Sequence, residues 1–136
     1  MTTPSEIPTV ATQSMRVSWH AQARIAVCSY SPNTTLTRKD AGVLIEALNR
    51  WIGSDREPFA TLGDAAGIRS ADPEYRAMTS KFYKEHKQEL FIALFNVGPL
   101  LRIMVEMFRV SSGLQFKAFV DEAEAREWLR RKGIAA

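Results

Sequence analysis

The sequence predicts an α/β protein with a mixed, mostly parallel five-stranded sheet and four helices, in the order β-β-α-β-α-β-α-β-α. Two observations carry this prediction. Strand patterns alternate with helix patterns from residue 24 onward, and residues 90–95 form an apolar run without polar alternation. Alternating strands and helices are typical of parallel sheets with crossover helices. A strand that is apolar on both faces is typical of the interior of such a sheet.

The first two strands, residues 15–19 and 24–30, are expected to form an antiparallel hairpin. Met15, Val17 and Trp19 alternate with polar residues, which is the pattern of a strand with one buried face. A parallel crossover needs a dozen or more residues, and the short connection here does not provide them. The hairpin therefore adds one antiparallel edge strand to the parallel sheet.

The first helix is predicted between Thr37 and Gly53. Thr37 and Asp40 have the spacing of a capping box, with Asp in place of Glu or Gln, and Gly53 suits a helix end. The apolar residues of the helix repeat at i, i+3, i+4 and i+7, so they predict one face buried against the sheet. They are Ala41, Leu44, Ile45, Leu48, Trp51 and Ile52.

The remaining elements continue the alternation. Pro at a first helical position and an acidic residue at an N-cap mark the helix starts, because both suit the unpaired amide groups there. The predicted ranges are 59–62 and 116–120 for strands, and 73–87, 99–110 and 121–132 for helices, with 90–95 as the fourth strand.

Length and composition indicate one globular domain, expected over residues 15–132, with a mobile N-terminal tail (1–14) and a C-terminal tail (133–136). The 18 Lys and Arg are offset by 15 Asp and Glu without a block of like charge, so no nucleic-acid partner is expected. The start lacks a basic, apolar leader, and residues 91–108 are too interrupted to span a membrane. We therefore expect a cytoplasmic protein.

The sequence offers little catalytic chemistry. Cys28 is the single cysteine, and His20 and His86 lack the spacing of metal ligands. No Ser–His or Cys–His motif is recognisable, so we expect neither an enzyme nor a metal or other cofactor. An enzyme would require distant residues such as Asp64 and Tyr75 to converge on a concave site.

The segment from Phe59 to Arg76 holds the first candidate binding site. It is predicted as a short strand, an acidic loop and a helix start, and such loops at the carboxyl ends of strands commonly meet ligands and partners. Acid–base or Mg²⁺ chemistry is one alternative for its carboxylates, but capping and the helix dipole explain two of them. The candidate residues are Asp64, Ser70, Asp72, Glu74 and Arg76.

The third helix holds the second candidate site. Its polar residues, Arg102, Glu106 and Arg109, form one narrow stripe, and the rest of the circumference is apolar. Either neighbouring helices bury this surplus, which is the usual outcome, or an exposed patch binds a partner, a second copy or a lipid-like ligand. The candidate partner-binding residues are Leu101, Met104, Val105 and Phe108.

The element order resembles that of STAS domains, the fold of anti-sigma factor antagonists, and in particular their SpoIIAA-like or CRAL-TRIO-like branch. The resemblance covers residues 15–132. It includes Asp64 after the third strand, the Asp72 helix start eight residues later, and the closing run from Phe116 to Leu129 with its acidic helix start and Ala-x-x-Trp-Leu ending.

The resemblance implies a non-enzymatic regulatory module that docks to another regulatory protein. In such antagonists a serine after the Asp of the second helix start is phosphorylated, and this switches binding. The matching residue here is Pro73, which has no hydroxyl, so the usual switch is not expected; Ser70 is a weak substitute. The alternative that the resemblance implies is a binder of small apolar ligands or lipids.

Overall fold

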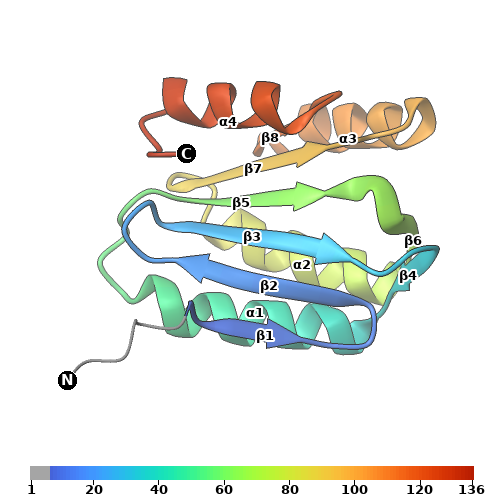
Figure 1. Ribbon diagram of the computed structural model, residues 1–136, viewed down its shortest axis with the longest axis horizontal. Helices are drawn as coiled ribbons and strands as arrows, with labels where there is room; N and C mark the ends of the chain where they lie inside the picture. The colour runs from blue at the N-terminus through green and yellow to red at the C-terminus, as the bar shows by residue number, and fades with distance from the viewer. Residues whose placement is uncertain (1–6) are drawn as a thin grey trace.

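The computed structural model describes residues 7–136, which form a mixed six-stranded sheet with helices on both faces (Figure 1). The sheet order is β1-β2-β3-β5-β7-β8; its first two strand pairs are antiparallel and the other three are parallel. The strands are β1 (Thr9–Ala11), β2 (Met15–His20), β3 (Ile25–Tyr30), β5 (Phe59–Asp64), β7 (Leu90–Phe95) and β8 (Gln115–Ala118). Two further strands, β4 (Thr34–Leu36) and β6 (Ile68–Ala71), pair in parallel as a small second sheet.

Helices α1 (Arg38–Ile52) and α2 (Pro73–Glu85) cover one face of the large sheet, and α4 (Glu122–Arg131) covers the other. On the first face, Leu48 of α1 and Phe82 of α2 pack into one cluster with sheet residues such as Val17. On the second face, Leu129 of α4 packs against a cluster that includes Leu62 of β5. Helix α3 (Pro99–Ser112) lies along β8 at the edge of the sheet.

The predicted α/β class, the four helices and the mostly parallel sheet are confirmed. Strand β7 lies between β5 and β8, and five of its six residues are buried, as its unbroken apolar sequence predicts. The hairpin of β2 and β3 is also confirmed, with Val17 opposite Cys28. Its turn includes Arg24, a non-glycine residue with φ of 57°.

The predicted number of strands was wrong, because three short strands were missed. Residues 9–11 were assigned to a mobile tail, yet they form β1, which pairs with β2 and makes the outer edge of the sheet. Of that predicted tail, residues 1–6 lie outside the described residues. The predicted C-terminal tail, residues 133–136, contains Ile134, which is buried in the core beneath α4.

The conformation predicted for the segment after β5, an acidic loop, was also wrong. Strand β5 extends to Asp64, a short 3₁₀ turn (Ala65–Gly67) follows, and β6 then pairs with β4. The turn packs closely on the end of β3: a Cβ on Gly67 would lie 2.5 Å from the carbonyl oxygen of Ser31. The candidate site therefore lies on a 3₁₀ turn and a strand and not on an irregular loop.

Candidate functional site

Asp64 lies at the carboxyl end of β5, where it connects two chain segments. Its Oδ1 accepts a hydrogen bond from the backbone N–H of Ala66 and another from Nδ2 of Asn96, each 3.0 Å long. Asn96 follows β7 with a positive φ of 56°, a conformation that Asn tolerates better than most residues. Asp64 thus fixes the 3₁₀ turn and contacts the chain that leads into α3.

Ser70 is exposed on β6, and its hydroxyl lies 3.0 Å from that of Thr35 on β4. Asp72 occupies the N-cap position of α2 as predicted, but its side chain makes no capping hydrogen bond. Glu74 and Arg76 are exposed on the first turn, and Glu74 lies 3.9 Å from Arg38 of α1. That ion pair is solvated, so it contributes at most about 1 kcal/mol to stability.

Helix α3 presents a row of exposed apolar side chains. Only Val105 of its 14 residues is buried. Leu101 and Phe108 are half-buried on the same side, and the ring of Phe108 lies 6.0 Å from that of Phe116 on β8. A second face is open, and we call it the α3 stripe. It consists of Leu100 (74% exposed), Ile103 (57%), Met104 (47%), Met107 (67%) and Val110 (71%).

The predicted partner-binding residues of α3 therefore divide between two faces. Met104 lies on the α3 stripe, whereas Val105 is buried, and Leu101 and Phe108 contact the sheet side. The expectation that neighbouring helices bury the whole apolar surplus was wrong for this helix. The other four residues of the α3 stripe were not among the candidates, although their helical spacing in the sequence could have identified a second apolar face. They are Leu100, Ile103, Met107 and Val110.

A polar border runs beside the α3 stripe. It contains Arg102, Glu106 and Arg109, together with Lys117 on β8. The Arg109 guanidinium donates to the Glu106 carboxylate at 3.2 Å. This hydrogen bond is the largest cause that lowers the pKa of Glu106, and the charge of Lys117 adds to it. Glu106 is thus ionised and paired within the border.

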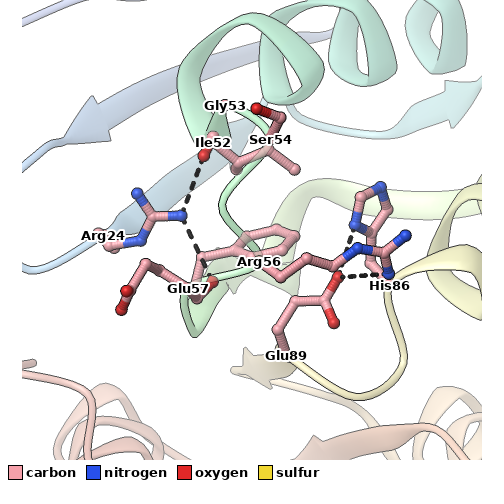
Figure 2. Close-up of a pocket in the computed structure, with 9 residues that line it drawn as sticks. Arg24, Ile52, Gly53, Ser54, Arg56, Glu57, His86 and Glu89 are labelled. Carbon is pink, nitrogen blue, oxygen red and sulfur yellow. Dashed lines mark hydrogen bonds and ion pairs between the residues drawn. The ribbon is translucent and has the colours of Figure 1, made fainter.

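A small pocket of about 180 Å³ lies beside the start of β5, at the opposite end of this strand from Asp64 (Figure 2). Its wall includes Glu89, which is 5% exposed. One oxygen of Glu89 lies 2.9 Å from Nδ1 of His86 and 3.5 Å from a guanidinium nitrogen of Arg56. The His86 ring also packs 4.5 Å from the ring of Phe82.

Two arginines of this pocket donate hydrogen bonds to backbone carbonyl oxygens around it. Arg24 donates to the carbonyl oxygens of Pro58 (3.0 Å) and Ile52 (3.2 Å), and Arg56 donates to that of Glu85 (3.3 Å). Ile52 and Glu85 end α1 and α2, whose C-termini carry partial negative charge. The pocket is also smaller than the roughly 300–1,000 Å³ of typical ligand sites. These contacts give it a structural role: they neutralise two helix ends.

On the α1–α2 side of the sheet, Cys28 and Tyr75 are buried, and Tyr30 and Tyr83 are partly buried. Burial raises the pKa of the Cys28 thiol to about 12, so the thiolate is scarce at neutral pH. Burial also raises the pKa of Tyr30, Tyr75 and Tyr83. None of these groups is activated as a nucleophile. Among residues 7–136, no three His, Cys, Asp or Glu side chains are grouped to hold a metal ion.

Comparison with known proteins identifies the fold but no sequence family. No protein-family model matches the chain, and no curated protein matches it. Among solved structures, the chain is similar to an uncharacterised DUF3478-family protein with a SpoIIAA-like fold from Shewanella loihica PV-4. The identity is 17% and the TM-score is 0.65, over 95% of this chain and 98% of that protein.

The chain is also similar to part of the murine anion transporter Slc26a9, with 12% identity and a TM-score of 0.56. That match covers 79% of this chain but only 18% of the transporter. Within residues 7–136, none of the helices has the length and apolar character required to cross a bilayer. The resemblance predicted from the sequence is confirmed at the level of the fold: the chain has a SpoIIAA-like fold.

Proposed function

We propose that this protein is a non-enzymatic, cytoplasmic regulatory module that acts by docking to another protein. The observation that carries the proposal is the α3 stripe, five large apolar side chains that are each at least 47% exposed on a single helix. The largest contiguous apolar patch on a monomeric protein is often a functional site. Full burial of one such side chain is worth about 1.5–3 kcal/mol, so covering the stripe would favour association.

The segment from Asp64 to Arg76 is proposed as the second part of the docking surface. Asp64, at the start of this segment, contacts Asn96, and Asn96 precedes α3 by only a few residues, so this end of the segment lies near the start of α3. Exposed Ser70, Glu74 and Arg76 supply polar groups for specificity. The surface therefore combines an apolar part with a polar part, which is the usual anatomy of a protein interface.

We do not include a phosphorylation switch in this proposal. In the resemblance to anti-sigma factor antagonists, Pro73 matches the serine that is modified, and it has no hydroxyl. Ser70 lies on β6 with its hydroxyl next to that of Thr35, and the neighbouring carboxylates of Asp72 and Glu74 would repel a phosphate.

Quantitative affinity capture from the cells that produce the protein tests the proposal. The tagged wild type is compared with Met104→Glu and Asp64→Ala, each checked for folding by circular dichroism. The control is Ile7→Glu, which adds a carboxylate at another exposed apolar position, beside β1 at the opposite edge of the sheet. We expect one specific partner whose recovery falls at least fivefold with Met104→Glu and is unchanged with the control. If both site variants recover the partner as well as the wild type does, the proposal is refuted.

A further inference from the structure

The geometry of the α3 stripe specifies the shape of what would cover it. Its residues are spaced by 3, 1, 3 and 3 positions, and at 3.6 residues per turn they span about 120° of the helix circumference. This width matches one apolar face of an amphipathic helix. Helices that dock in this way contribute apolar residues at i, i+3, i+4 and i+7, so a second helix is the complementary shape.

The polar border beside the stripe specifies the charge of the occupant. It holds three cations (Arg102, Arg109 and Lys117) and one carboxylate (Glu106), a net charge of +2. Glu106 is paired with Arg109. Within the described part of the chain, Arg102 and Lys117 make no ion pair. An occupant with acidic side chains along this border would be attracted, and one with basic side chains would be repelled.

This charge argues against a second copy of the chain as the occupant. In a symmetric antiparallel pair of α3 helices, the same border lies on the same side of both subunits, so the two positive borders would adjoin. Juxtaposed like charges disfavour association.

The composition of the stripe argues against a membrane surface. Helices that lie in a membrane interface usually have Trp or Phe on the apolar face and many Lys or Arg on the polar face. The α3 stripe has no aromatic residue, and its border contains the paired Glu106. Met104 and Met107 instead suit a protein surface, because their flexible side chains adapt to the shape of a partner.

We propose that the α3 stripe binds an amphipathic helix of a partner protein that carries acidic side chains along one edge. This inference rests on the docking function proposed above and names the chemistry of the partner. One helix face of five side chains is smaller than either side of a standard interface, which buries about 800 Å² per partner. Binding of an isolated helix is therefore expected to be weak and reversible, with Kd in the micromolar range.

Fluorescence anisotropy with two designed peptides tests this inference. Both are labelled helical 20-mers with the same leucine face; one has Glu along one edge and the other has Lys. We expect the Glu peptide to bind at least about tenfold more tightly at low salt, and this preference to shrink at about 0.5 M salt because salt screens surface charge. The Met107→Glu variant should bind the Glu peptide at least tenfold more weakly than the wild type, and the Ile7→Glu variant should bind it as tightly as the wild type.

A charge-reversal variant gives the sharper test. Arg102→Glu changes the border from net +2 to net zero and should remove most of the preference for the Glu peptide while the leucine face still binds. Equal affinity of the wild type for both peptides, or preference for the Lys peptide, would overturn the inference. So would a wild-type dimer in sedimentation that Met107→Glu dissociates, or stripe-dependent binding to phosphatidylcholine–phosphatidylglycerol vesicles without peptide binding.

The two proposals fail in different ways. If affinity capture yields a partner that depends on Met104 but the peptides show no charge preference, the docking function stands and the acidic helix is wrong. If recovery does not depend on the site variants, the docking function itself is wrong, whatever the peptides do.

Discussion

The hydroxyl of Thr12 donates a 2.6 Å hydrogen bond to Oδ1 of Asp40, which joins the β1–β2 turn to the first turn of α1. The other oxygen of Asp40 accepts from the backbone N–H of Thr37 at 2.9 Å, as the predicted capping spacing requires. Asp40 is 2% exposed, so both oxygens depend on protein donors. A single buried carboxylate thus caps α1 and positions the edge of the sheet.

Replacement of Asp40 with Ala should strongly destabilise the protein. It leaves the donors of Thr12 and Thr37 without their acceptor, and the lost cap and the unpaired buried groups together should cost about 2–4 kcal/mol. Urea denaturation followed by circular dichroism measures this change. Asp55→Ala is the matched control because Asp55 is exposed in a loop, and it should stay within about 0.5 kcal/mol of the wild type. Equal stability of the two variants would contradict the role given to Asp40.

The pocket in Figure 2 makes a second prediction, through Glu89. Glu89→Ala removes the acceptor for His86 and Arg56 and should lower the free energy of unfolding by about 2 kcal/mol, because the mostly buried His86 ring loses a charge-assisted hydrogen bond. Glu85→Ala, four residues earlier and exposed, should be nearly neutral. If the pocket instead bound a ligand at the expense of stability, Glu89→Ala would leave stability unchanged or raise it.

Two glycines should respond to alanine with opposite signs. At Gly67 the added methyl group would lie 2.5 and 2.7 Å from the carbonyl oxygens of Ser31 and Tyr30, so the turn must move; we expect a loss of about 1–3 kcal/mol. At Gly42, inside α1, a Cβ meets nothing within 4 Å, and Ala should stabilise the helix by up to about 1 kcal/mol. Thermal unfolding of both variants tests the pair, and a stabilising Gly67→Ala would show that the turn is loosely packed.

The buried tyrosines predict a loss of stability in strong base. Burial raises the pKa of Tyr30, Tyr75 and Tyr83 above the ordinary value of 10.0, so the folded protein holds these protons where the unfolded chain releases them. Stability should therefore fall as the pH rises above 10, by at most about 1.4 kcal/mol per pH unit for each tyrosine. A smaller loss should begin above pH 9, because burial raises the pKa of the Cys28 thiol from 9.0 to about 12.

Urea denaturation at a series of pH values from 8 to 11.5, with absorbance at 295 nm to detect tyrosinate, measures this effect. Tyr83→Phe should reduce the slope above pH 10, because it removes one titrating group and keeps the ring. Tyrosinate that forms at pH 10 without unfolding would contradict the burial of these hydroxyl groups.

The helices and the long strands were predictable because their signals are local. Pro73 and Pro99 begin α2 and α3 where a missing N–H costs nothing, and Asp121 caps α4 through the backbone N–H of Glu124. The apolar run of β7 requires burial on both faces wherever the strand lies. Each of these features depends on residues within a few positions of one another, so the amino-acid order alone is enough.

The short strands and the outer face of α3 depended on the tertiary structure. Strands β1 and β4 have three residues each, too few for a period, and β4 forms only because β6, more than 30 residues later, lies beside it. The sequence of α3 is apolar around most of its circumference and does not state which part is covered. Because α3 lies along the edge strand β8, neighbours bury Val105 and leave Met107 open, and the position of the helix at the sheet edge decides where the candidate site lies.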